Sequence, residues 1–204
     1  IKWHWLYMEL STLAIGVIFV WKYKYPFLMM PIAVTLWYLT MDITAMISGG
    51  DFDWALRKLV SMYSGLLMIA LAFWVDIRSR NKADYAFWIY LFGVMAFWIG
   101  MSLQYSDSEL SKFIYFSINI FMIGIGVILV RRVFVIFGAI GACGYIGHLA
   151  FDIFKDSWLF PITLTVVGLL VVYLGVLWQK HELSITTKAR NILPTQLREL
   201  LESK

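Results

Sequence analysis

Apolar residues gather in long blocks that short polar segments separate, and this pattern dominates the chain. Seven blocks hold about twenty residues each, the length that an α-helix needs to cross roughly 30 Å of hydrocarbon. The blocks are apolar on all sides, whereas a membrane β-strand would alternate apolar and polar residues. The pattern predicts an all-α polytopic transmembrane helical bundle with seven spans, over residues 4–21, 27–48, 56–76, 84–104, 110–130, 133–153 and 158–178.

The chain changes character after Gln179, where polar residues become frequent. We therefore expect a transmembrane bundle over residues 1–179 and a cytoplasmic tail over residues 180–204. Within this tail, leucines at 193, 197, 200 and 201 predict a short amphipathic helix next to a break at Pro194. Such a helix is marginal alone in water, so we expect it to lie against the membrane surface, the protein's own loops or a partner.

Basic residues are distributed unevenly among the segments between the predicted spans. Cytoplasmic loops of membrane proteins retain lysine and arginine, so the distribution indicates an orientation. An outside N-terminus and an inside C-terminus place twelve of the seventeen basic residues in the cytoplasm: Lys22, Lys24, Arg78, Arg80, Lys82, Arg131, Arg132, Lys180, Lys188, Arg190, Arg198 and Lys204. The orientation depends on the tight joint at Arg131 and Arg132, because every later span would invert if the helices on either side were not separate.

The composition agrees with a lipid environment. Hydrophobic residues make up 61% of the chain and the mean hydropathy is +0.77, well above the range of soluble domains. The lipid bilayer is the expected partner. Tryptophan and tyrosine cluster near the predicted span ends, where they favour the headgroup level, so the aromatic content gives no reason to expect nucleic-acid binding.

Among the ionisable residues within the predicted spans, where a charge costs about 3 kcal/mol at the bilayer centre on insertion scales, four are candidates for a function. They are Glu9, Asp42, His148 and Asp152. In the predicted topology all four lie in the outer third of the membrane, although they come from three helices. This shared depth makes them candidates for binding a solute or accepting protons.

Neighbouring polar residues extend this group. Thr35 and Tyr38 share a helical face with Asp42, and Lys112, Tyr115 and Asn119 form a similar stripe in the fifth span. We expect an outward-facing polar pocket between spans one, two, five and six. The alternative is structural, since His148 and Asp152 lie at i and i+4 and can hydrogen-bond to each other beside the headgroups.

The sixth predicted span carries glycine at every third position, at Gly138, Gly141, Gly144 and Gly147. Helices in lipid approach each other through small residues, so these glycines are expected to pack against a neighbouring helix. The run is not a dinucleotide-binding loop, because it does not follow a strand.

The sequence indicates no metal and no cofactor. The three histidines are predicted to lie on opposite sides of the membrane, and the chain has no zinc-binding motif. No lysine lies deep in the seventh span, which argues against a retinal Schiff base. We therefore do not expect an enzyme, and an enzyme that acts on a lipid is a third alternative to transport or sensing and to a structural role.

The C-terminal third, from Phe137 to Pro161 and from Gly175 to Glu182, resembles a family of uncharacterised bacterial polytopic inner-membrane proteins. The resemblance implies a location in the bacterial inner membrane and supplies no catalytic residues.

Two functions follow from these observations. The first is transport or sensing of a small solute or protons, with Asp42 as the central binding group and His148 and Asp152 as a titratable pair. The second is a structural or assembly subunit of a larger membrane protein complex, or a homo-oligomer, which would use the glycine-rich span as a contact surface.

Overall fold

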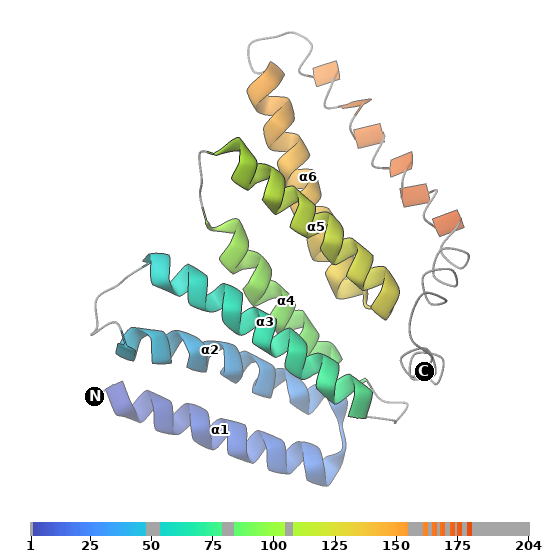
Figure 1. The fold of residues 1–204 in the computed structure, drawn as a ribbon. Coiled ribbons are helices and arrows are strands. Elements are labelled where there is room, and N and C mark those ends of the chain that lie inside the picture. Colours follow the sequence, from blue (N-terminus) through green and yellow to red (C-terminus); the bar gives the residue numbers. More distant parts are fainter. Residues whose placement is uncertain are drawn as a thin grey trace. The chain divides into compact units, whose positions relative to one another are not determined.

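The computed structural model describes residues 2–47, 54–78, 84–104 and 108–154, and short helical pieces at 161–162, 165–166, 168–169, 172–173, 175–176 and 179–180. Within these ranges the chain forms helices and connecting turns and no strand (Figure 1). The predicted all-α class is therefore confirmed for the described residues.

Six helices lie where the first six spans were predicted, and their observed ends differ from the predicted ends by a few residues. They are α1 (Lys2–Tyr23), α2 (Met29–Ile47), α3 (Trp54–Arg78), α4 (Phe87–Ser102), α5 (Glu109–Leu129) and α6 (Arg132–Phe154), and a short 3₁₀ turn, η1 (Pro26–Leu28), precedes α2. The seventh span is described only at the short helical pieces, and the predicted amphipathic helix of the tail lies outside the described residues.

Four stretches are long and apolar enough to cross a membrane: His4–Tyr23, Pro26–Met46, Trp54–Arg78 and Leu110–Leu129. In contrast, α4 has 16 residues, and its length of about 24 Å is less than the hydrocarbon thickness. A shorter apolar stretch also occurs at Arg132–His148. Four candidate spans are thus found in the described part of the chain, while seven spans and the N-outside orientation stay predictions.

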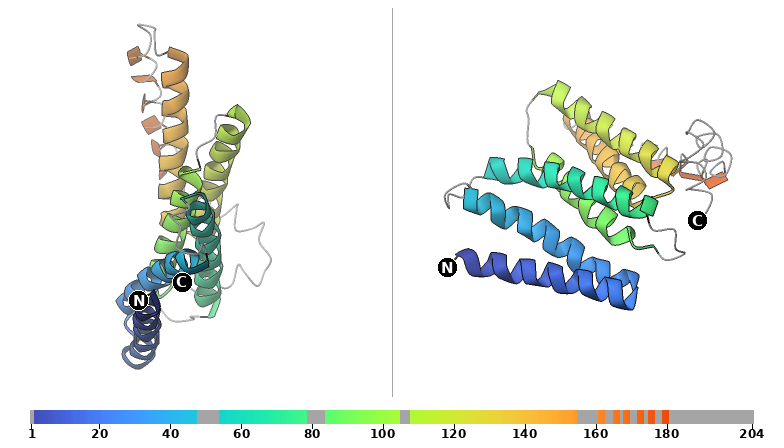
Figure 2. Two further views of the ribbon diagram at one scale, coloured as in Figure 1. Left: turned by 90° about the vertical axis from the view of Figure 1, so that its left-hand side faces the viewer. Right: turned by 60° about the horizontal axis from the view of Figure 1, so that its bottom comes forward.

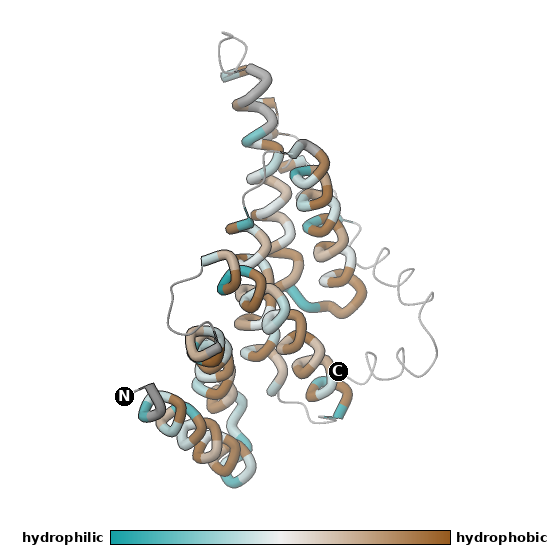
Figure 3. Tube along the Cα trace, turned by 60° about the vertical axis from the view of Figure 1, so that its left-hand side comes forward, coloured by the Kyte–Doolittle hydropathy of each residue, from teal (hydrophilic) through white to brown (hydrophobic). Residues whose placement is uncertain are grey.

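The chain divides into two compact units, Ile1–Tyr105 and Ser106–Lys204, and each is described by itself. In the first unit α2 lies between α1 and α3, and α4 packs against both α3 and α2 (Figures 1 and 2). Hydrophobic residues run along every helix (Figure 3). The predicted division into a bundle over 1–179 and a tail over 180–204 stays a prediction.

The tightest contact in the first unit joins α3 and α4 through glycines. A Cβ atom on Gly65 would lie 2.3 Å from the backbone nitrogen of Phe97, and one on Gly100 would lie 2.6 Å from that of Met62. The buried hydroxyl of Ser61 donates a hydrogen bond to the carbonyl of Ala96, at 2.9 Å. Small residues therefore bring the two backbones into direct contact, as is usual for helices in lipid.

The turn between α1 and α2 is held against the start of α4. Lys24 directly follows α1 and has a φ of 50°, in the left-handed region. The Tyr85 hydroxyl donates a hydrogen bond to the Lys24 carbonyl, and the rings of Phe27 and Trp88 meet edge to face at 5.5 Å. These contacts fix the turn to the rest of the first unit.

In the second unit α5 and α6 form a helical hairpin joined by only Val130 and Arg131. Val130 adopts the left-handed conformation (φ 56°), and the Arg131 N–H donates to the carbonyl of Gly126 at 2.8 Å, which closes the end of α5. The tight joint noted in the sequence thus separates two distinct helices, which pack against each other.

Candidate functional site

The candidate site lies where α1 meets α2. Half-buried residues recur along α1 with helical spacing, at Leu6, Glu9, Leu13, Gly16 and Val20, so this face turns toward α2. A Cβ atom on Gly16 would lie 2.8 Å from Cγ1 of Ile32. The close approach at Gly16 brings the two helices together and leaves Glu9, two turns earlier, facing the second half of α2.

Glu9 meets Asp42 across this interface. The carboxyl group of Glu9 is close enough to that of Asp42 to interact with it electrostatically, and both residues are half-buried. Oε2 of Glu9 is buried and has no hydrogen-bond partner among the described residues. Of the four ionisable residues selected from the sequence, the structure brings these two together.

Two neighbouring carboxylates repel each other when both are ionised, and little water is present in a membrane to screen this repulsion. A hydrogen bond between them requires one proton, since an ionised carboxylate can only accept. A small cation between the oxygens would serve the same purpose. The geometry therefore suits the binding of one positive charge between α1 and α2.

The other polar residues predicted on this face of α2 are placed differently. The Thr35 hydroxyl donates to the carbonyl of Pro31 at 2.8 Å, one turn earlier in the same helix. Tyr38 lies one turn before Asp42, and 59% of its surface is exposed. Neither shows a contact with the carboxyl pair, so their role as binding residues stays a prediction.

A layer of hydroxyl groups lies between α2, α3 and α4, and its residues were not among the site residues predicted from the sequence. The Thr44 hydroxyl donates to the Thr40 carbonyl at 2.6 Å, and the Thr40 hydroxyl lies 3.5 Å from that of Ser64. Thr44 and Ser61 are both buried. The sequence does contain a signal for this layer, because Thr40 and Thr44 are four residues apart in α2 and Ser61 and Ser64 are three apart in α3. Each spacing places the two hydroxyl residues on one face of their helix.

Asn119 belongs to the second unit and is wholly buried between α5 and α6. Its amide nitrogen donates to the carbonyl of Tyr115 at 2.8 Å. A Cβ atom on Gly141 would lie only 2.0 Å from Oδ1 of Asn119. The side chain thus fills the space that the missing side chain of Gly141 leaves open, and the role of Asn119 as a binding residue stays a prediction.

The glycines of α6 fall into two groups. Gly138 and Gly141 lie against α5, where a Cβ atom would meet Asn119 and Ile123. Gly144 and Gly147 have no described atom within 4 Å of the position that a Cβ would take, apart from their own surroundings in the helix. The first two glycines pack within the hairpin, and the last two lie on a face of α6 that no other described residue covers, which we call the open face.

His148 is exposed near the end of α6, and the side chain of Asp152 lies outside the described residues, although its backbone is helical. Both belong to the second unit, whereas Glu9 and Asp42 belong to the first. A single pocket that combines all four residues stays a prediction. The described part of the chain contains no group of three or more histidine, cysteine, aspartate or glutamate residues that could hold a metal ion.

No family model matches this chain, and neither a curated protein nor a solved structure matches it.

Proposed function

We propose that this chain is a multi-pass membrane protein in which the Glu9–Asp42 pair binds a proton or a small cationic solute, for transport or sensing. The contact between these two carboxyl groups, on two helices that are each long and apolar enough to span a membrane, supports the proposal. Ionisable groups in such helices are costly and mark ion pathways and proton relays.

The contact between the helices makes this pair suited to the role. Each helix contributes one carboxyl group, so a bound positive charge would hold α1 against α2 and its release would allow the two carboxylates to repel each other. The bound state of the pair is then coupled to the spacing of the helices. In the N-outside orientation that the basic residues favour, the pair faces the outer half of the membrane. A location in the bacterial inner membrane is part of the proposal and depends on the resemblance of the C-terminal third.

The test is proton flux into proteoliposomes that hold a pH-sensitive dye. We expect flux with the wild-type chain, and Asp42→Asn should lower it to the level of empty vesicles because the amide cannot accept a proton. Asp84→Asn is the matched control, since Asp84 is an exposed carboxylate outside the helices. Equal flux in wild type and Asp42→Asn, with equal protein incorporation, would contradict a role of the pair in proton binding.

A second candidate function is a structural or assembly subunit of a membrane complex or homo-oligomer. The open face of α6 at Gly144 and Gly147 favours it, because small residues on an uncovered helix face allow another helix to approach closely. The described residues of the hairpin leave this face free of close contacts.

Gly144→Leu separates assembly from folding. The substitution adds a large side chain to the open face, so we expect it to leave the α5–α6 hairpin intact and to break any association with other chains. The measurement is the mass of the protein in native lipid nanodiscs, compared with Gly124→Leu, which places the same side chain at an open position on α5. A mass that is unchanged from that of an associated wild type would contradict an assembly role for this face.

A further inference from the structure

Basic and aromatic residues alternate at the end of α1, where the chain reads Trp21, Lys22, Tyr23, Lys24, Tyr25. The aromatic rings are strongly exposed, with 81% of Trp21 and about 60% of the two tyrosines accessible. Nζ of Lys22 lies 5.7 Å from the centre of the Tyr23 ring, within the range of a cation–π contact.

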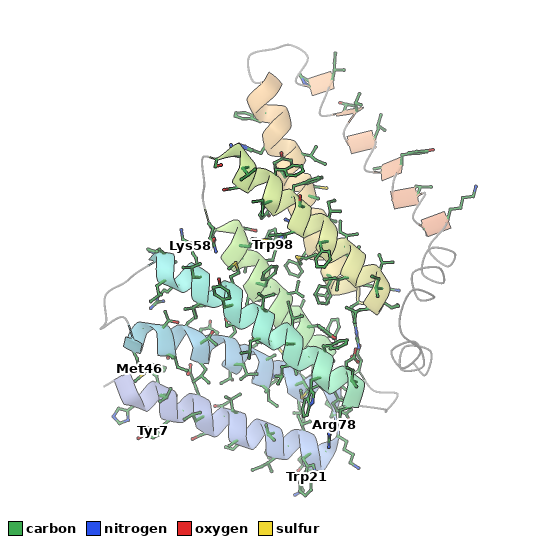
Figure 4. All side chains as sticks on the ribbon, in the orientation of Figure 1. Tyr7, Trp21, Met46, Lys58, Arg78 and Trp98 are labelled. Atoms are coloured by element: carbon green, nitrogen blue, oxygen red, sulfur yellow. The ribbon has the colours of Figure 1, made fainter. Side chains whose placement is uncertain are left out.

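The end of α3 repeats this combination. The guanidinium carbon of Arg78 lies 5.7 Å from the centre of the exposed Trp74 ring. Figure 4 shows Trp21 and Arg78 at one end of the first unit, while Tyr7, Met46 and Lys58 lie at the other end. The basic and aromatic residues at the end of α1 therefore lie at the same end of the first unit as those at the end of α3.

The turn that carries these lysines is fixed in place. Tyr85, just before α4, donates a hydrogen bond to the Lys24 carbonyl, and Phe27 contacts Trp88 at the start of α4. One rim is thus formed by four neighbouring segments of the first unit. They are the C-terminal end of α1, the turn after it, the C-terminal end of α3 and the start of α4. Among the described residues the charged side chains of this rim are Lys22, Lys24, Arg78, Asp76 and Asp84, and both aspartates have interactions within the protein.

We infer that this rim binds the phosphate headgroup of anionic phospholipids. Exposed tryptophan and tyrosine rings favour the headgroup level, and lysine and arginine at that level attract anionic lipid. Lys22 and Arg78 are held beside rings that would lie at this depth, and Lys24 lies between two exposed tyrosines in the sequence, so a headgroup phosphate can approach these cations without withdrawing from the membrane. The inference depends on the membrane placement proposed above, but not on the Glu9–Asp42 pair.

The test uses the full chain in vesicles made of equal parts phosphatidylcholine and phosphatidylglycerol. The quantity measured is the enrichment of phosphatidylglycerol among the lipids that stay bound after gentle detergent extraction. Each cation near a charged surface contributes about a five-fold preference, so the triple variant Lys22→Gln, Lys24→Gln, Arg78→Gln should lower the enrichment at least about tenfold. High salt should lower it in the wild type as well, since exposed charges are screened.

The matched control is the double variant Arg57→Gln, Lys58→Gln, which removes cations from the other end of the first unit. We expect it to keep most of the enrichment. Unchanged enrichment in the triple variant, or an equal loss in the control, would overturn the inference. Proton flux measured on the same triple variant keeps the two proposals apart, because the lipid rim can fail while flux through Glu9 and Asp42 is retained.

Discussion

Replacing Gly65 with alanine is expected to destabilise the first unit by about 3 kcal/mol, the upper part of the usual range for overpacking. The added Cβ would lie 2.3 Å from the backbone nitrogen and 2.7 Å from Cα of Phe97, and 2.7 Å from the carbonyl oxygen of Gly93. All three atoms belong to the backbone of α4, so no side chain can rotate away to relieve the overlap. The two helices must therefore separate along their contact.

The measurement is the thermal unfolding midpoint of the chain in lipid nanodiscs. Gly124→Ala is the control, because it makes the same chemical change inside a helix where a Cβ meets no described atom within 4 Å. That change should be neutral or stabilising by up to about 1 kcal/mol, since alanine favours the helix. If Gly65→Ala lowered the midpoint no more than the control, the close contact between α3 and α4 would be wrong.

The helices could be predicted from the sequence because their signal is local. A block of apolar residues bounded by charged residues specifies a helix by length alone, and α1 to α6 follow the predicted ranges closely. The short length of α4 could not be predicted from its apolar block, which covers residues 84–104. Residues 84–86 and 103–104 are compatible with a helix in composition, yet the chain leaves the helix after Ser102 and enters it only at Phe87. Before Phe87 the Tyr85 hydroxyl is bonded to the Lys24 carbonyl, a contact between distant segments that composition does not show.

The candidate site was only partly accessible to sequence reasoning. The cost of an ionisable group in a span selected Glu9 and Asp42 as individual residues. Their pairing depends on the register of the α1–α2 hairpin, which the approach of Gly16 to Ile32 and the fixed turn at Lys24 determine. Asn119 shows why one polar residue alone does not define a binding site. A polar residue on the face of a span suggests binding, but the interior of a hairpin also accepts a polar side chain that bonds to its own helix.

Gly141→Ala should have the second-largest effect, a loss of about 2 to 3 kcal/mol in the stability of the α5–α6 hairpin. The new Cβ would overlap with the Asn119 amide, at 2.0 Å from Oδ1 and 2.4 Å from the amide carbon. Asn119 has no exposed surface and its amide nitrogen is bonded to the Tyr115 carbonyl, so the side chain has no free space to enter. Thermal unfolding in nanodiscs measures the loss, and Gly144→Ala, one turn further along α6 on the open face, is the control.

The double variant Asn119→Ala, Gly141→Ala decides what Asn119 does. If Asn119 occupies the space left by Gly141, removing its amide makes room for the new methyl group, and the double variant should be more stable than Gly141→Ala alone. The coupling energy should exceed about 1 kcal/mol, as for other residues in direct contact. Independent effects would instead show that the two residues do not share this space. If Asn119→Ala alone also abolished flux while the coupling was absent, Asn119 would act in binding and not in packing the hairpin.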